Sequence, residues 1–401
     1  MTSRIRRVVG EATFLTILTV VPAAMHVTAS AQGPSSVGRL RRELRIGSVN
    51  EDSLALSRVG SLVVGREGSI YVSQPQEATI KVFDSQGGYR ADIGRDGGGP
   101  GEFRNLTGMG WLGDTLWVAD SRLRRVSFFS PDGTYWGSMP LDYVPAGRSG
   151  VPIAVDGLLQ GEAVVGQPVV ETQLALGRQL AEMPIVLMNG SGTTITLAVR
   201  DLRRFRYLVQ TERGVTVSTY QPLDDSPLVQ TAPNGASVVV VERSAATHPD
   251  NSQFRVTKLL PTMDTVFSRQ VDYVPVRVPA SVLDSVLNRA VESIRRLYGN
   301  LRDARSGARA ALYLPKFYPP VTSIAVSSEG TVWLRREAMA ADSVHWDVLD
   351  GRSGRLLTTV TAPAGLEIFE VQRDRLWGVE TDQFDVPYVV GYAIQVSERG
   401  R

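Results

Sequence analysis

Two passages near the start of the chain share one pattern of short apolar runs separated by turn residues. In the first, Gly68–Val72 leads to Ile80–Asp84, and in the second, Gly113–Asp120 leads to Arg125–Phe129. Tyr71 and Trp117 lie 46 positions apart, as do Phe83 and Phe129. Alternating runs of this length, bounded by Asp-Gly and Gly-Gly, are typical of antiparallel hairpin strands.

The same pattern returns late in the chain. Gly330–Leu334 leads to Trp346–Asp350, and Trp377 follows Trp333 by 44 positions. A repeat near 45 residues with four strands per unit is typical of a β-propeller blade. The pattern therefore predicts an all-β fold in which the repeated aromatic residues Tyr71, Trp117, Trp333 and Trp377 pack between neighbouring sheets.

Counting the repeats predicts six blades, and the last of them has only three strands. The alternating segment Leu40–Ile46 precedes the first blade and can supply the missing strand, which would close the ring. We therefore expect a six-bladed propeller over residues 32–396, followed by a short tail at 397–401. The predicted blades cover residues 59–97, 106–142, 150–199, 226–272, 320–361 and 367–394.

One segment has the period of a helix instead of a strand. In Ser281–Tyr298, apolar residues recur at three- and four-residue spacing, Pro279 precedes the segment, and Gly299 follows it. We predict an amphipathic helix within an insertion at about 279–314, lying across the ring with its apolar face down. It is either a structural lid on the channel or, with the polar loop Arg302–Arg309, a docking surface for a partner.

The N-terminus has the order of a secretory signal peptide. Arg4, Arg6 and Arg7 precede an apolar run that ends near Val21, and an Ala-Ser-Ala sequence ends at Ala31. We expect residues 1–31 to be cleaved after Ala31, which predicts a periplasmic or secreted protein. A first core helix is the alternative, and the export route, general or twin-arginine, stays open. No later apolar stretch is long enough for a transmembrane helix.

Charge and composition exclude several function classes. The chain has 43 Lys and Arg against 41 Asp and Glu, so it lacks the basic surplus of a nucleic-acid-binding protein. It has no cysteine, which excludes disulfides and thiolate chemistry. It also lacks the G-x-S-x-G motif of a serine hydrolase. We expect a monomer whose partner is a protein or a small molecule.

Two segments resemble a known family. Gly94–Phe103 followed by Leu116–Asp120 resembles the junction between NHL-type repeats, and Asp382–Val390 is similar to the closing blade of exported bacterial six-bladed propellers. The resemblance covers residues 40–396 loosely and 59–142 tightly, and it is lost between about 143 and 320. It implies a fold more than an activity, because propellers carry many unrelated functions.

The glycines and histidines do not form a recognisable catalytic motif. Gly94–Gly101 lacks the Lys-Ser/Thr and the helix of a phosphate-binding loop, so we interpret it as a tight turn between blades. Some NHL-like enzymes are lyases that hold a metal with several histidines. After Ala31, only His248 and His345 remain, which are too few for a three-histidine zinc site.

Two sets of residues are candidates for binding. Arginines follow the second strands of the second and fifth blades, where they could share one face and bind carboxylate or phosphate groups, although their clustering can also reflect an arginine-rich composition. These arginines are Arg122, Arg124, Arg125, Arg335 and Arg336. Carboxylates at equivalent places could instead hold calcium, as in lactonase-type propellers. These carboxylates are Asp120, Glu337, Glu380 and Asp382.

The prediction of function is therefore a non-enzymatic ligand- or protein-binding propeller of the bacterial cell envelope, with no catalytic residues and no cofactor. The alternative is a calcium-dependent lactonase- or lyase-like propeller with its metal in the central channel.

Overall fold

The computed structural model describes residues 36–141, 153–161, 163–168, 181–189, 194–210, 216–248, 250, 252–298, 304–336 and 343–398. The chain divides into two units, residues 1–32 and 33–401, and the fold below is that of the second unit. The predicted signal peptide at residues 1–31 lies outside the described residues, as do the last three residues of the predicted tail.

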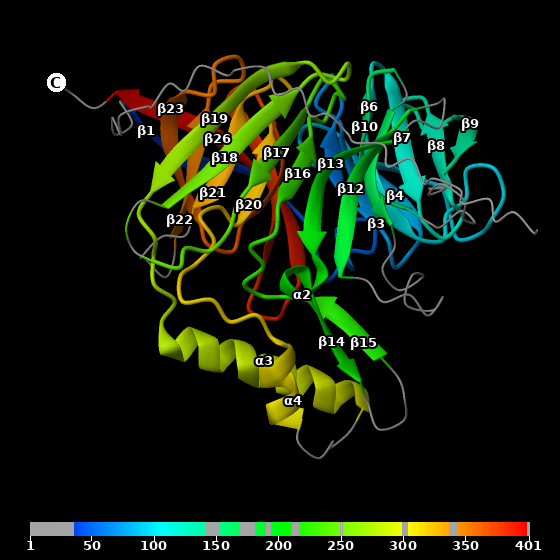
Figure 1. Cartoon of the computed structure of the whole chain (residues 1–401). Helices are drawn as coiled ribbons and strands as arrows, with labels where there is room; N and C mark the ends of the chain where they lie inside the picture. The colour runs from blue at the N-terminus through cyan, green and yellow to red at the C-terminus, as the bar shows by residue number, and fades with distance from the viewer. Residues whose placement is uncertain are drawn as a thin grey trace, which may run out of the picture. The chain divides into compact units, whose positions relative to one another are not determined.

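Four antiparallel sheets contain four strands each, and in every one the strands follow chain order (Figure 1). The first two sheets are β2 (Leu62–Val64), β3 (Ile70–Gln74), β4 (Thr79–Phe83) and β5 (Tyr89–Ile93), then β6 (Leu106–Leu112), β7 (Thr115–Asp120), β8 (Arg125–Phe129) and β9 (Tyr135–Pro140). The next two are β10 (Ile153–Leu159), β11 (Ala163–Pro168), β12 (Glu182–Met188) and β13 (Thr194–Asp201), then β16 (Leu228–Thr231), β17 (Val238–Glu242), β18 (Ser252–Leu259) and β19 (Thr265–Tyr273).

A fifth sheet has eight strands, in the order β20-β21-β22-β23-β1-β26-β25-β24. Its members are β1 (Ser36–Ile46), β20 (Ser323–Val326), β21 (Val332–Arg336), β22 (Ser343–Leu349), β23 (Leu356–Pro363), β24 (Glu367–Gln372), β25 (Arg375–Thr381) and β26 (Pro387–Glu398). The N-terminal strand therefore lies in the middle of a sheet built from the C-terminal part of the chain.

The prediction of six separate blades is wrong, because β1 forms hydrogen-bonded ladders on both of its sides. It pairs antiparallel with β26, as expected for the strand that completes the last repeat. It also pairs in parallel with β23 over Val37, Gly38 and Arg39, which joins the last two strand sets into one sheet. Gly38 permits this close approach: a Cβ built there would lie 2.7 Å from Cγ2 of Val360. The arrangement is thus four four-stranded sheets and one eight-stranded sheet.

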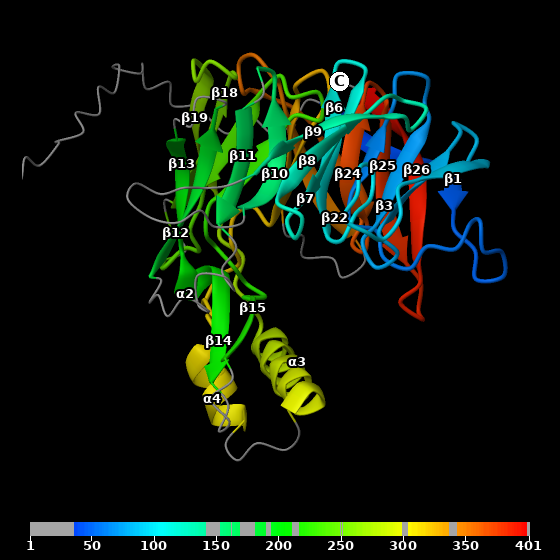
Figure 2. The same cartoon turned by 90° about the vertical axis from the view of Figure 1, so that its right-hand side faces the viewer.

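The first strands of successive strand sets form a closed ring, which is the arrangement of a β-propeller. Strand β2 contacts β6, β6 contacts β10, β10 contacts β16, β16 contacts β20, β20 contacts β24, and β24 contacts β2. Figure 2 shows the sheets in a second view, turned by 90°. The contact between β24 and β2 closes the ring. The turns that follow these six strands gather at one end of it.

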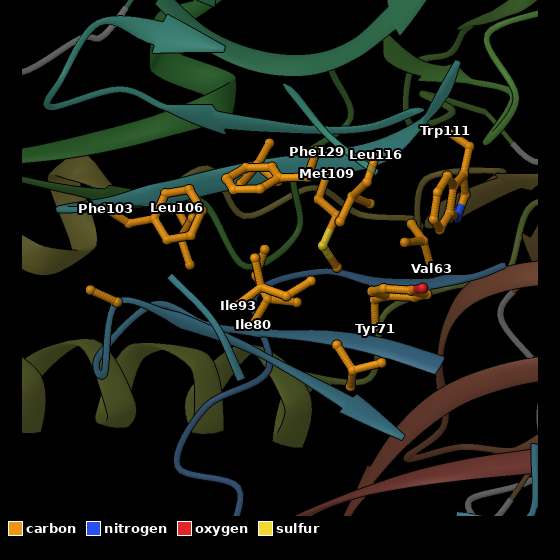
Figure 3. Packing of buried hydrophobic residues seen from close by; sticks show 13 residues of the cluster. Val63, Tyr71, Ile80, Ile93, Phe103, Leu106, Met109, Trp111, Leu116 and Phe129 are labelled. Carbon is orange, nitrogen blue, oxygen red and sulfur yellow. The ribbon is translucent and has the colours of Figure 1, made fainter. Parts of the chain in front are cut away.

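The core lies in seams between neighbouring sheets. In the seam between the first two sheets, Tyr71 and Ile80 from one side meet Trp111, Leu116 and Phe129 from the other (Figure 3). The repeated aromatic residues Tyr71, Trp117, Trp333 and Trp377 are all less than 8% exposed, so the prediction that they are buried is confirmed. With no cysteine in the sequence, apolar packing in these seams must stabilise the ring.

The helical insertion has a small core of its own. Helix α3 (Ala280–Tyr298) forms where the sequence predicts it, and its buried residues Val286, Leu287, Ala290 and Ile294 pack against Ala308 and Leu312. Ala308 belongs to α4 (Ala304–Ala311), which overlaps the segment Arg302–Arg309 that was predicted to be a polar loop, and Leu312 directly follows α4. That prediction is wrong, and so is the prediction that α3 lies with its apolar face on the ring, because α4 covers this face.

Three further elements were not predicted. They are the short helix α2 (Leu202–Phe205) and the hairpin of β14 (Arg206–Gln210) and β15 (Thr216–Tyr220). Strand β14 contacts both α2 and α4. Gln221 then fixes the end of the insertion, because its amide nitrogen donates a hydrogen bond to the carbonyl of Ala311 at 2.9 Å. None of the helices in the described part of the chain is both long enough and apolar enough to cross a membrane.

Candidate functional site

A cavity of about 1090 Å³ lies where the turns after the first strands gather. We call it the central cavity, because every strand set of the ring contributes to its wall. One representative from each set is Arg66, Asp114, Gln160, Asn234, Glu329 and Arg373. Ligand pockets of proteins have volumes of about 300–1,000 Å³, so this cavity is slightly larger than that range.

Aromatic side chains form part of the cavity wall. Tyr71, Trp111 and Trp377 all line it. The rings of Tyr71 and Trp111 meet edge to face, with 5.1 Å between their centroids (Figure 3). The Tyr71 hydroxyl donates a hydrogen bond to the carbonyl of Pro131 at 2.7 Å, which leaves this side chain fully engaged. The aromatic wall is therefore rigid and preformed.

The Trp111 indole nitrogen is different, because it has no hydrogen-bond partner although it is buried. Trp111 is 9% exposed. Buried donors in folded proteins nearly always have an acceptor, and an unpaired one needs a specific explanation. This nitrogen has almost no accessible surface, so it does not face the cavity, and the indole nitrogens of Trp117 and Trp346 are also buried without a partner.

Glu370 is a buried carboxyl group in the same wall. It is 1% exposed and lies on β24, the first strand of the last set. Its Oε2 accepts a hydrogen bond from the backbone N–H of Val64 at 2.6 Å, and its Oε1 accepts one from the amide of Gln372. Gln372 also donates to the Val64 carbonyl at 3.1 Å. Glu370 and Gln372 together thus bind both backbone groups of Val64, as a neighbouring β-strand would.

Burial raises the pKa of Glu370 to about 8. Hydrogen bonds from Gln372 and Val64 act in the opposite direction, and the nearby Glu329 carboxylate raises the pKa further. The desolvation cost of a charged carboxylate exceeds the benefit of two hydrogen bonds here, so the group is mostly protonated at neutral pH. The cavity wall therefore presents a neutral carboxylic acid at this point.

The rim of the cavity carries charges of both signs. Arg66 forms an ion pair with Asp114 at 2.9 Å, and both side chains are more than 60% exposed. On the other side of the β24–β25 turn, Arg375 lies 3.5 Å from Glu43. Exposed pairs of this kind contribute little to stability, about 0–1 kcal/mol, so these groups can rearrange around a ligand.

Among the predicted arginines, Arg125 holds the glycine-rich turn together. Its guanidinium donates to the carbonyls of Gly98, Gly99 and Glu102. Gly94 and Gly101 have φ angles of 78° and 73°, which confirms that this segment is a tight turn that requires glycine. Arg122 lies in the β7–β8 connection, and Arg124 in the same connection has a φ angle of 53°.

The second arginine pair belongs to a different sheet. Arg335 donates to the carbonyl of Ala364 at 3.2 Å. Arg336 pairs with Asp347 at 3.3 Å and lies over the rings of Phe254 and Tyr273. Each arginine is thus engaged beside its own strand, and an anion site formed by Arg122, Arg124, Arg125, Arg335 and Arg336 stays a prediction.

Three of the four predicted calcium ligands serve as hydrogen-bond acceptors. Asp120 is 1% exposed and accepts four backbone N–H groups, those of Arg104, Asn105, Arg122 and Leu123, at 2.6–3.0 Å.

Glu380 accepts from the Tyr392 hydroxyl and from Arg42, and Asp382 accepts the backbone N–H groups of its own turn. Glu337 lies outside the described residues. Over the part of the chain that the structure describes, no three His, Cys, Asp or Glu residues gather as a metal site.

The residues that line the central cavity were not predicted from the sequence. The predicted site residues follow second strands, whereas Glu329 and Arg373 follow the first strands of their sets. The repeat itself held a usable signal, since the turns after all first strands of a propeller lie at the same end of the ring. Glu370 carried no such signal, because its partner Val64 lies 306 positions away.

The sequence matches no protein-family model and no curated protein. The structure is similar to that of a duf4221 family member from Bacteroides vulgatus, with a TM-score of 0.49 and 11% identity over 90% of this chain and 99% of that chain. It is also similar to a candidate exported protein from Bacteroides fragilis, with a TM-score of 0.44 and 12% identity over 90% and 96% of the two chains.

A gluconolactonase from Xanthomonas campestris is similar at a TM-score of 0.41, with 12% identity over 90% of this chain and 98% of that chain. With TM-scores below 0.5, these similarities carry no argument about function. The resemblance to NHL-type repeats also stays a prediction, and the assignment as a β-propeller rests on the ring of strands described above.

Proposed function

We propose that this chain is an exported, non-enzymatic binding protein that holds a small polar ligand in its central cavity. The observation that carries the proposal is the cavity of about 1090 Å³, walled by turns from every strand set of the ring. A concave site with aromatic walls and a few polar groups is the usual form of a ligand-binding site.

Two features of the wall support a ligand rather than a simple gap in packing. Charged residues of both signs surround the opening. The aromatic wall is also held in place by the edge-to-face contact and by the Tyr71 hydrogen bond. A preformed site loses little conformational entropy on binding, which favours affinity.

Export belongs to the proposal because of the N-terminal sequence alone. The order of basic residues, apolar run and Ala-Ser-Ala at residues 29–31 is that of a cleaved signal peptide. The calcium-dependent enzyme is not proposed. Of its four predicted ligands, Asp120 and Asp382 bind backbone N–H groups of turns and Glu380 accepts from Tyr392, whereas Glu337 is outside the described residues.

A blocked cavity tests the proposal. Gln160 is exposed at the cavity edge and makes only a 3.4 Å side-chain hydrogen bond, so Gln160→Trp should fill space without unfolding the protein. Calorimetry would compare the protein without residues 1–31 with this variant against a panel of short peptides, amino acids, amino sugars, neutral sugars and sugar acids.

We expect at least one compound class to bind with 1:1 stoichiometry and to lose about tenfold or more in affinity in Gln160→Trp. Gln253→Trp is the control, since Gln253 is exposed on β18, outside the cavity. Binding that is equally strong in both variants would place the ligand elsewhere and contradict the proposal, as would a panel without any binding.

A further inference from the structure

Some charged residues at the rim of the central cavity form ion pairs, and others do not. Arg66 is paired with Asp114, and Arg375 with Glu43. Within the described residues, no ion pair involves the side chains of the other four charged rim residues. These are Glu67, Glu329, Arg373 and Asp374.

Arg373 and Glu329 are connected through the backbone. The Glu329 carboxylate accepts the N–H of Arg373 at 3.0 Å, so the carboxylate sits at the base of the β24–β25 turn while the guanidinium stays free of a carboxylate partner. Arg373 has a φ angle of 52°. Residues other than glycine rarely adopt this conformation, which costs energy and is concentrated at functional sites. The turn thus presents a cation beside a fixed anion.

We propose that the central cavity binds a short peptide with free termini, a ligand that carries an ammonium group at one end and a carboxylate at the other. Glu329 would hold the ammonium and Arg373 the carboxylate. This inference rests on the proposed function. The volume favours two or three residues over a single amino acid, because the cavity exceeds the usual size range of ligand pockets.

Terminal blocking tests the proposal chemically. A tripeptide library with mixed side chains would be measured by calorimetry in four forms: free, N-acetylated, C-amidated and doubly blocked. We expect the free library to bind and each single block to weaken binding by about tenfold, because each block removes one charge-assisted hydrogen bond. The doubly blocked library should show no measurable binding.

Two variants assign the termini to residues. Glu329→Gln keeps an oxygen that can accept the Arg373 N–H, and it should weaken the free library while leaving the N-acetylated library unchanged. Arg373→Asn should weaken the free library and leave the C-amidated library unchanged, and asparagine tolerates the left-handed backbone that this position requires. The control is the double variant Glu242→Gln, Arg255→Gln, which removes an exposed ion pair on another sheet.

The possible results separate this proposal from the proposed function. If an amino sugar or a sugar acid binds in the cavity but no tripeptide does, the peptide proposal is wrong and the ligand-binding function stands. If free single amino acids bind as tightly as tripeptides, the length argument fails. If blocked and free tripeptides bind equally, recognition of the charged termini is overturned. If no compound of any class binds, both proposals fail.

Discussion

Two carboxyl groups in this molecule are equally buried but differently surrounded. Asp120, at the β7–β8 turn, is 1% exposed and accepts four backbone N–H groups. Glu370, in the wall of the central cavity, is also 1% exposed but accepts only one backbone N–H and one side-chain amide. The first group organises a turn, whereas the second ties two strands together next to an open space.

The difference shows what burial alone does not reveal. A buried carboxylate surrounded by N–H donors is a structural acceptor, and such groups are common at turns. A buried carboxyl with few donors has a raised pKa instead, as Glu370 does, and such groups are concentrated at functional sites. The hydrogen-bond partners of a buried acid therefore distinguish the two roles better than its exposure does.

The largest effect is expected at Asp120. Asp120→Ala would leave four backbone N–H groups without an acceptor, each at a cost of about 1–3 kcal/mol. We expect a loss of about 5 kcal/mol in the free energy of unfolding, or failure to fold, in urea titrations followed by circular dichroism. The control is Asp132→Ala in an exposed turn of the same sheet, where the loss should be much smaller. Equal losses at both positions would contradict the assigned role.

The next effect is a pH dependence that comes from Glu370. Its pKa is about 8 in the folded protein and near 4.5 in the unfolded chain. Between these values the folded state holds a proton that the unfolded chain has released, so the free energy of unfolding falls as pH rises from about 4.5 to 8. Since a tenfold change in proton affinity corresponds to about 1.4 kcal/mol, the loss should be on the order of 4 kcal/mol.

The measurement is the difference between the protein and Glu370→Gln, by urea unfolding at several pH values. This difference removes the contribution of other groups, such as Asp156, whose pKa burial raises to about 6. The variant should be the more stable protein at pH 8 and should lose its advantage toward pH 5. A difference that is constant across this range would show that Glu370 is charged throughout.

The smallest effect compares amide variants of the two acids at pH 5, where the pH-dependent advantage of Glu370→Gln is lost. Glu370→Gln replaces a neutral acid with a neutral amide, so we expect a change below about 1 kcal/mol in the free energy of unfolding. Asp120→Asn replaces one of two accepting oxygens with a donor that faces backbone N–H groups, which should cost about 2 kcal/mol. The same urea titrations give both values. A larger loss at Glu370 than at Asp120 would reverse the comparison.

The sequence was sufficient to predict much of the fold, because its repeats are local. The strands around Tyr71, Trp117, Trp333 and Trp377 lie where the period near 45 predicts them, and β1 pairs with β26 as expected. The second pairing of β1, with β23, could not be predicted, because it depends on Gly38 meeting Val360 across more than 300 residues. The packing of α4 on the apolar face of α3 could not be predicted either, because α4 consists largely of Arg, Ser, Gly and Ala and has few large apolar residues.

The candidate site was harder to predict than the fold. The carboxylates and arginines were predicted as ligand-binding residues because they follow second strands. In the structure, Asp120 and Arg125 instead form hydrogen bonds with the backbone of nearby turns. Glu370 and Val64 belong to the last and first strand sets, which meet only when the ring closes. The contact between Glu370 and Val64 forms by ring closure across 306 positions, so it leaves no spacing motif in the sequence.

The most direct test of the central claim is a crystal structure of the protein without residues 1–31, soaked with the free tripeptide library. We expect electron density for a peptide in the central cavity, with its ammonium at Glu329 and its carboxylate at Arg373. Density beside Arg122 and Arg125 or beside Arg335 and Arg336, with an empty central cavity, would contradict it.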